Sequence, residues 1–224
     1  MSGKRKPVSE KFNRAFPGAN KLIAQLFDEV RKSNPDPERV RRIITQNPAI
    51  IRHRHSNAHT ALIEAVRKGH AEIVDILVDA CVAEKAQASS GNIAFRFSIR
   101  NGYPQLARKL LERGIDPNTR IDDETLLSSA VRHNQPDIVR LLLDKGADVN
   151  TQCSQGVTPL MYATPPEREK MLKMLLASGA DTEKKDYSGD TALIRATRYA
   201  NNLPALNMLI AAGADLDADN KQNR

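Results

Sequence analysis

The chain has 224 residues, of which 40% are hydrophobic and 27% charged, and its formal net charge is +7. This composition is typical of a soluble globular protein and excludes a disordered or membrane-embedded chain. No apolar run reaches the roughly 18 residues that a membrane-spanning helix requires, and the basic N-terminus lacks the apolar stretch of a secretory signal. We therefore expect an intracellular protein, cytoplasmic or nuclear.

The N-terminal quarter carries the positive charge of the chain. Residues 1–55 hold 13 Lys or Arg against 5 Asp or Glu, whereas the remaining 169 hold 21 against 22. Residues 1–20 are expected to form a mobile basic tail, in which Lys4-Arg5-Lys6 is a short candidate for nuclear targeting. Two helices are predicted next, at Lys21–Lys32 and Pro37–Gln46, and residues 21–55 are interpreted as a degenerate N-terminal cap repeat.

A short motif with a period near 33 residues dominates the rest of the chain. Its copies begin at Thr60, Ile93 (a degenerate copy), Thr125, Thr158 and Thr191. A second marker, Gly-Ala-Asp or Gly-Ile-Asp, begins at Gly114, Gly146, Gly179 and Gly213, at intervals of 32, 33 and 34 residues. Two independent markers with one period indicate a repeat protein.

Each repeat is predicted to hold two short helices. In the first copy, Leu62 and Ala65 fall on one helical face, Gly69-His70 breaks the chain, and Ile73 and Leu77 lie on a second apolar stripe. Each Gly-Ala-Asp is predicted to end a helix, because glycine adopts the left-handed conformation at little cost. The glycines two residues before three of the motifs are predicted to form tight turns with positive φ; these are Gly91, Gly156 and Gly189.

These patterns resemble the ankyrin repeat family over about residues 56–224, in five repeats at about 56–88, 89–120, 121–153, 154–186 and 187–224. The segments that carry the resemblance are Gly69-His70-Ala71-Glu72-Ile73-Val74, Gly146-Ala147-Asp148-Val149-Asn150 and Gly156-Val157-Thr158-Pro159-Leu160. The Thr-Pro-Leu-His signature of the family is nowhere complete, and the second repeat is the weakest match. The resemblance implies an all-α solenoid of helix-turn-helix units joined by β-hairpin-like turns, acting as a non-catalytic protein-binding scaffold or adaptor.

In that family partners bind the concave face, formed by the first helices, and the hairpin tips. The position seven residues after each motif start holds Arg67, Arg100, Arg132, Pro165 and Arg198, and its neighbours include Lys68, His133 and Tyr199. Because the arginine fork binds carboxylates and phosphates, this ladder predicts a partner protein with an acidic or phosphorylated segment. Hairpin residues Asp122, Glu124 and Tyr187 are further candidate partner-binding residues. Alternatively, each arginine only offsets its helix dipole and points into water.

Two other functions are kept as alternatives. The basic residues 1–55 suit nucleic acid or an anionic membrane, although no nucleic-acid-binding fold accompanies them. The chain also stops at Arg224 inside what would be the next hairpin. It is therefore also considered as the recognition part of a larger enzyme or of a secreted bacterial effector.

No catalytic, cofactor or metal site is predicted, because the chain lacks a phosphate-binding glycine loop and the common hydrolase, metalloprotease and kinase motifs. The cluster of His53, His55 and His59 is interpreted as a set of hairpin residues, not as metal ligands. Cys81 and Cys153 are expected two repeats apart, beyond the roughly 7 Å limit of a disulfide, and therefore as free thiols, with Cys153 at a hairpin tip. We expect a monomer.

Overall fold

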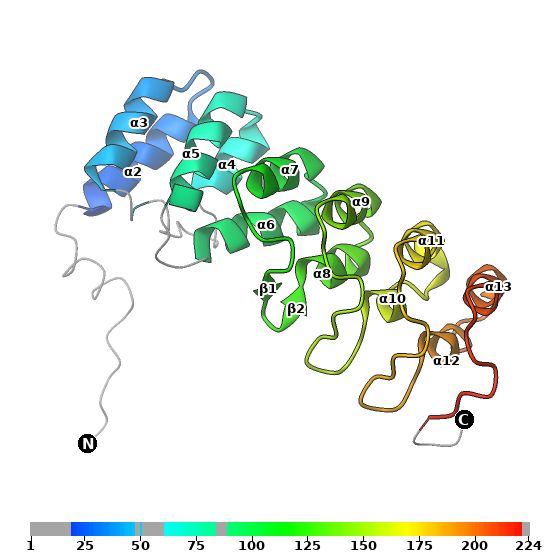
Figure 1. The fold of residues 1–224 in the computed structure, drawn as a ribbon. Helices are drawn as coiled ribbons and strands as arrows, with labels where there is room; N and C mark the ends of the chain where they lie inside the picture. Colours follow the sequence, from blue (N-terminus) through cyan, green and yellow to red (C-terminus); the bar gives the residue numbers. More distant parts are fainter. Residues whose placement is uncertain (1–18, 48–49, 51–60, 84–88, 221–224) are drawn as a thin grey trace, which may run out of the picture. The chain divides into compact units, whose positions relative to one another are not determined.

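A computed structural model describes residues 19–47, 50, 61–83 and 89–220 (Figure 1). The chain divides into two compact units, Met1–Ala94 and Phe95–Arg224. Most of the expected N-terminal tail lies outside the described residues, but Ala19 and Asn20 belong to the first helix.

The first unit is built from pairs of helices. They are α2 (Ala19–Arg31), α3 (Pro37–Gln46), α4 (Ala61–Lys68), α5 (Ala71–Ala83) and the start of α6 (Ser89–Asn101). Helix α2 packs against α3 and α4, and α5 packs against α3 and α4. The two helices predicted before Gln46 are therefore present. Their apolar stripes close the core of this unit, where Leu26, Val40 and Leu77 are fully buried.

The turn between α2 and α3 is organised around a buried carboxylate, Glu29. It accepts hydrogen bonds from the Asp36 amide at 3.0 Å and from Lys32 Nζ at 2.8 Å, and it lies 3.2 Å from Arg39 Nε. Burial raises the pKa of Glu29, but the Asp36 hydrogen bond and the charges of Lys32 and Arg39 together lower it below its usual value. The carboxylate therefore stays ionised and fixes the turn.

The second unit stacks inner and outer helices in two layers. After α6 its elements are α7 (Pro104–Glu112), β1 (Arg120–Ile121), β2 (Glu124–Thr125), α8 (Leu126–Arg132), α9 (Pro136–Asp144), α10 (Pro159–Tyr162), the 3-10 turn η2 (Pro166–Arg168), α11 (Glu169–Ala177), α12 (Ala192–Ala196) and α13 (Leu203–Ala211). The inner helices α8, α10 and α12 pack in succession, and so do the outer helices α7, α9, α11 and α13. This is the predicted all-α helix-turn-helix architecture.

The repeated threonine caps the inner helices. The side chains of Thr125, Thr158 and Thr191 accept hydrogen bonds from the amides three residues on, at 3.1, 3.2 and 3.3 Å. Because the first amides of a helix have no partner within the helix, a hydroxyl at this position stabilises the helix start. The periodic threonine in the sequence therefore marks where each inner helix begins.

The predicted glycine turns are present at most positions. Gly146 has φ 81°, and the following amide of Ala147 donates to the Leu142 carbonyl at 2.9 Å, which closes the end of α9. Gly156 has φ 74° in the turn before α10. The prediction for Gly91 was wrong, because Gly91 lies inside α6, which begins at Ser89. In the degenerate copy Ile93 stands where three other copies have the threonine that starts the inner helix.

Asparagine side chains join successive repeats of the second unit. Asn118 Oδ1 accepts from the Asp148 amide at 2.7 Å, and Asn150 Oδ1 accepts from the Asp181 amide at 2.8 Å. Each link reaches from one repeat to the next, 30 or 31 residues along the chain. These bonds fix the spacing of neighbouring repeats.

A second row of links joins the bases of the hairpins. Arg120 donates to the Gln152 carbonyl at 3.1 Å, Gln152 donates to the Lys185 carbonyl at 3.0 Å, and Lys185 donates to the Asp219 carbonyl at 3.0 Å. In each case the side chain reaches the backbone at the equivalent position of the following repeat. Different side chains, a guanidinium, an amide and an ammonium, thus perform the same task.

Candidate functional site

Two of the predicted arginines form the same ion pair within their own repeats. Arg132 binds Glu124 in two-pronged fashion, with nitrogen–oxygen distances of 2.9 and 2.8 Å, and Arg198 Nη2 lies 2.5 Å from Asp190 Oδ2. In both repeats the acid directly precedes the capping threonine and the arginine follows it by seven residues. The hydrogen bond with Glu124 raises the pKa of Arg132 further, despite partial burial. These two charges are therefore already neutralised.

The other positions of the ladder differ from this pattern. Arg67, in the first unit, lies 3.8 Å from Glu64 on the same helix. Where Pro165 replaces the arginine, Val157 replaces the acid, so the repeat loses both members of the pair. Arg198 was expected on an inner helix, but it lies beyond α12, because the Thr197 hydroxyl donates to the Ile194 carbonyl at 2.7 Å and the helix ends.

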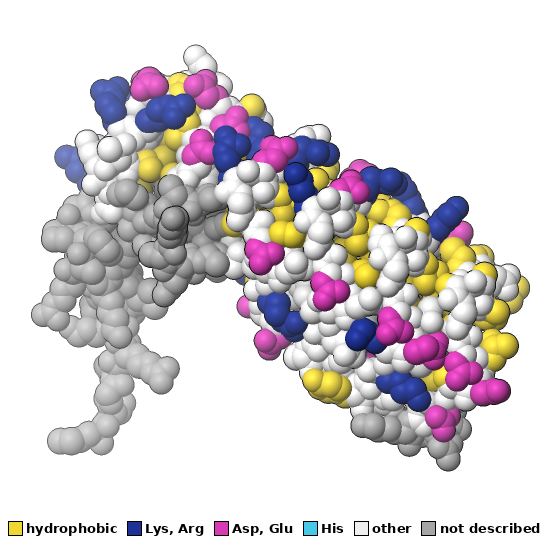
Figure 2. Space-filling model, viewed as in Figure 1, with side chains coloured by type: hydrophobic (Ala, Val, Ile, Leu, Met, Phe, Trp, Pro, Cys, Tyr) yellow, Lys and Arg dark blue, Asp and Glu magenta, His cyan; other side chains and the backbone are white. Residues whose placement is uncertain are grey.

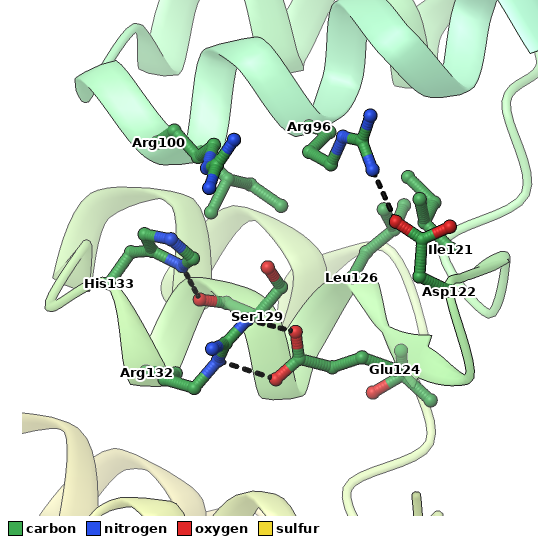
Figure 3. Close-up of a pocket in the computed structure, with 11 residues that line it drawn as sticks. Arg96, Arg100, Ile121, Asp122, Glu124, Leu126, Ser129, Arg132 and His133 are labelled. Atoms are coloured by element: carbon green, nitrogen blue, oxygen red, sulfur yellow. Dashed lines mark hydrogen bonds and ion pairs between the residues drawn. The ribbon is translucent and has the colours of Figure 1, made fainter.

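Arg100 lies in a pocket between α6, the β1–β2 hairpin and α8 (Figure 3). The cavity has a volume of about 140 Å³. Its lining brings together five residues that were predicted from the sequence as partner-binding, namely Arg100, Asp122, Glu124, Arg132 and His133. Arg100 has no hydrogen-bond or ion-pair partner among the described residues, and its side chain is exposed. Within the described structure, Arg100 is therefore the arginine of this pocket that remains available to bind an anionic group.

Arg96 and Asp122 form the opposite wall of the pocket through an ion pair (Figure 3). Asp122 and Asp123 are the two turn residues of the β1–β2 hairpin, with φ of 51° and 64°; a type I′ hairpin turn has positive φ at both of these positions. Arg96 was not among the residues predicted from the sequence. Its contact depends on how the hairpin folds back toward α6, which no local pattern shows.

His133 and Ser129 complete the polar lining on α8. His133 Nδ1 lies 2.9 Å from the Ser129 carbonyl oxygen. Since a carbonyl only accepts hydrogen bonds, Nδ1 carries the hydrogen and Nε2 is left for another partner. The pocket therefore presents a guanidinium, an imidazole and two ion pairs over an apolar base formed by Ile99 and Leu126, which are fully buried.

The remaining predicted residues do not join this pocket. Arg67 and Lys68 belong to α4 in the first unit, whereas Arg198 and Tyr199 follow α12 in the second. Tyr187 is 68% exposed on the hairpin before α12, and its amide donates to the Gln155 carbonyl of the preceding hairpin at 3.1 Å. It lies over Gly156, where an added Cβ would come within 2.8 Å of the ring.

Comparison with protein-family models gives the repeats a name. A model described as ankyrin repeats (3 copies) matches residues 27–121 and 127–220. The chain belongs to the ankyrin repeat family. No curated protein matches it. Ankyrin repeats are generally protein–protein interaction modules and are typically non-catalytic, which agrees with the function that the motifs imply.

The arginines of the basic helix α3 make contacts within the chain. Arg39 Nε lies 3.2 Å from Glu29, and Arg41 Nε lies 3.4 Å from Glu38. Arg42 Nε donates to the Glu38 carbonyl at 3.4 Å. The basic residues at 52 and 54 and the histidines at 53, 55 and 59 lie outside the described residues. Acidic neighbours therefore offset part of the positive charge on α3.

Cys153 is the first residue of the tight turn at the tip of its hairpin, since the Gly156 amide donates to the Cys153 carbonyl at 2.9 Å, but its side chain is buried. It is 8% exposed, its amide donates to the Val157 carbonyl at 3.0 Å, and its Sγ lies 3.7 Å from the Tyr162 hydroxyl. Burial and the contact with Cys153 raise the pKa of Tyr162 to about 12. Cys153 is a free thiol that packs in the interior.

Two further observations concern the described part of this ankyrin chain alone. It contains no group of three or more His, Cys, Asp or Glu side chains arranged to hold a metal ion. Its helices are also too short or too polar for any of them to cross a bilayer.

Proposed function

We propose that this ankyrin chain is a non-catalytic scaffold or adaptor that binds an acidic or phosphorylated segment of a partner protein along its inner helices and hairpins. The observation that carries the proposal is the pocket of Arg100. Two arginines in its walls are bound by acids of the same chain, and the third has no partner among the described residues. An unpaired guanidinium in a partly enclosed pocket is suited to an anionic group.

The positions of the exposed acidic side chains also favour binding of the partner's acidic segment near Arg100. Figure 2 shows acidic side chains gathered over the hairpins near the C-terminal end of the second unit. The exposed acids of these hairpins are Asp181, Glu183, Asp215, Asp217 and Asp219. Because like charges repel, an acidic segment is disfavoured there and favoured near Arg100.

The test is affinity capture from cytosol with the wild-type chain, followed by Arg100→Ala. We expect Arg100→Ala to lose the captured partner while the melting temperature stays unchanged, because Arg100 is exposed and makes no ion pair in the described structure. Arg140→Ala is the matched control, since Arg140 is also exposed and has no ion-pair partner in the described part of the chain, but lies on the outer helix α9. Equal capture by wild type and Arg100→Ala would contradict the proposal.

For the paired arginines of the ladder, a loss of capture must be interpreted together with the stability of the variant. Arg132→Ala and Arg198→Ala leave Glu124 and Asp190 without their cation, so a loss of capture by these variants also reflects a change in stability. Substituting both members of a pair, as in Arg132→Gln with Glu124→Gln, removes the charges together. Retained capture by that double variant would assign the pair a structural role.

A further inference from the structure

We propose that the pocket of Arg100 accepts a carboxylate from an aspartate or glutamate side chain of the partner, in preference to a phosphate group. This inference rests on the proposed function, because it states which of the two acidic groups the same site selects. It follows from the charges that line the pocket and from how they are already paired.

The pocket has a surplus of one positive charge. Three arginines and two acids line it, and Arg96 and Arg132 are held by Asp122 and Glu124. One added negative charge on Arg100 therefore balances the site. A carboxylate carries one negative charge, whereas a phosphoryl group carries about 1.5 to 2 at neutral pH.

The additional negative charge of a phosphoryl group has no second unpaired arginine in the pocket to bind. It would lie in the same small cavity as the carboxylates of Asp122 and Glu124, and like charges at such distances repel, most of all where water is partly excluded. To gain a second guanidinium, the phosphoryl group would have to displace Asp122 from Arg96, or Glu124 from its two-pronged bond with Arg132. Such bidentate pairs are among the strongest hydrogen-bonded contacts in proteins.

The size and the base of the pocket suit one short acidic side chain. The volume of about 140 Å³ corresponds to a few water molecules, each occupying about 30 Å³ in the liquid. The base is apolar, with Ile99 and Leu126 buried beneath the charged rim. Ile121 also lines the pocket and is partly exposed, so the methylene groups of an aspartate or glutamate would contact it while the carboxylate meets Arg100.

The experiment compares three short peptides that differ at one central position, which is glutamate, phosphoserine or glutamine. Their ends are acetylated and amidated, so that no terminal charge contributes. Binding to the full chain is followed by NMR through the side-chain Nε–H signal of Arg100, which Arg100→Lys identifies. We expect the glutamate peptide to shift this signal saturably, the phosphoserine peptide to bind about tenfold more weakly, and the glutamine peptide to leave it unchanged.

Two variants make the electrostatic argument specific. Glu124→Gln releases Arg132 and removes a repelling acid. We therefore expect this variant to bind the phosphoserine peptide about tenfold more tightly, with a smaller gain in affinity for the glutamate peptide. Arg140→Gln on α9 removes a positive charge outside the pocket, so it controls for general attraction to a basic surface and should change neither affinity. Circular dichroism of each variant verifies that it is folded.

The outcomes separate this inference from the proposed function. Phosphoserine binding as tight as glutamate binding in the wild type would overturn the carboxylate preference and leave the adaptor function standing. An unmoved Arg100 signal with both acidic peptides, together with loss of partner capture by Arg100→Ala, would also overturn it, because capture would then depend on chemistry other than a single acidic side chain. Failure of Arg100→Ala to affect capture would count against the proposed function itself.

Discussion

Glu124, which precedes α8, and Arg132, the last residue of α8, bind each other with two guanidinium nitrogens 2.9 and 2.8 Å from the two carboxylate oxygens. The same relationship joins Arg198 to Asp190, and it is absent as a whole where Pro165 and Val157 stand. An arginine that is kept or lost together with its acid belongs to the internal structure of its repeat. The row of arginines in the sequence is thus not a row of free charges, and Arg100 is set apart from it.

The two equivalent ion pairs should differ in their contribution to stability. Asp190 is 2% exposed and also accepts from Asn220 Nδ2 at 2.7 Å, whereas Glu124 is 14% exposed. We expect Arg198→Ala to lower the free energy of unfolding by about 1–3 kcal/mol, because it leaves a buried carboxylate without its cation. Arg132→Ala should cost about 1 kcal/mol or less.

Urea denaturation of both variants measures this difference. Adding Asp190→Asn to Arg198→Ala should restore part of the loss, since the uncompensated charge is removed. An equal cost for the two arginine substitutions would show that the burial of the acid does not decide the effect.

Gly156→Ala should be more damaging than Gly146→Ala. Both glycines have positive φ, 74° and 81°, so both substitutions strain the backbone, at a cost of about 1 kcal/mol. A Cβ at Gly146 meets open space, whereas at Gly156 it would come within 3.0 Å of the Tyr187 amide nitrogen and 3.1 Å of the Asp186 Cα. Thermal unfolding should show the larger decrease for Gly156→Ala.

Because those contacts are with backbone, truncation of Tyr187 should not rescue the variant. Full rescue of Gly156→Ala by Tyr187→Ala would mean that the aromatic ring alone causes the conflict.

Thr158→Ala should lower the free energy of unfolding by about 1 kcal/mol through loss of a helix cap. Its hydroxyl accepts from the Met161 amide at 3.2 Å at the start of α10, where Thr158 is 1% exposed. Thr158→Ser keeps the hydroxyl and should recover most of the stability. If serine and alanine behave alike in chemical denaturation, the methyl group and not the cap accounts for the periodic threonine.

Acid should destabilise the second unit through Asp186. Burial raises the pKa of this carboxyl, but the hydrogen bonds from Arg195 and from the amides of Asp190 and Ser188 hold it below the usual 3.8. A lowered folded-state pKa adds stability above the unfolded-state value, and this stability is lost as the pH falls through the folded-state value. We therefore expect the free energy of unfolding to be steady above about pH 5 and to decrease below about pH 4.

Asp186→Asn should flatten that decrease, as measured by urea denaturation at several pH values. Asp144→Asn, at an exposed position on α9, serves as the control and should leave the pH profile unchanged. An acid profile that Asp186→Asn does not alter would assign the sensitivity to other carboxylates, such as Glu29 in the first unit.

The repeat period predicted the helices well because the marker residues act locally. Thr125, Thr158 and Thr191 cap the helices that follow them, and Gly146 ends the helix that precedes it, so these signals depend on a few neighbouring residues. Where the local signal is missing, at Ile93, the predicted start was wrong and α6 begins earlier, at Ser89. The period thus located the repeats more reliably than the boundaries of each helix.

The candidate site was predicted only in part, because its contacts are not local. Arg100 was selected by its register, but the ion pair of Arg96 with Asp122 spans 26 residues and depends on the fold of the hairpin. The pair of Arg132 with Glu124 did leave a signal in the sequence, since an acid directly precedes the threonine in both repeats that form the pair. Comparing that position between repeats would have separated the paired arginines from Arg100.

The hydrogen bonds from Arg120 to Gln152, from Gln152 to Lys185 and from Lys185 to Asp219 have a mechanical consequence. Each of these bonds connects one repeat only with the next, so breaking one bond leaves the others intact. Under force, one interface between repeats can therefore open while the others stay closed. We therefore expect the second unit to extend under force in several steps, each the length of one repeat, and not in a single step.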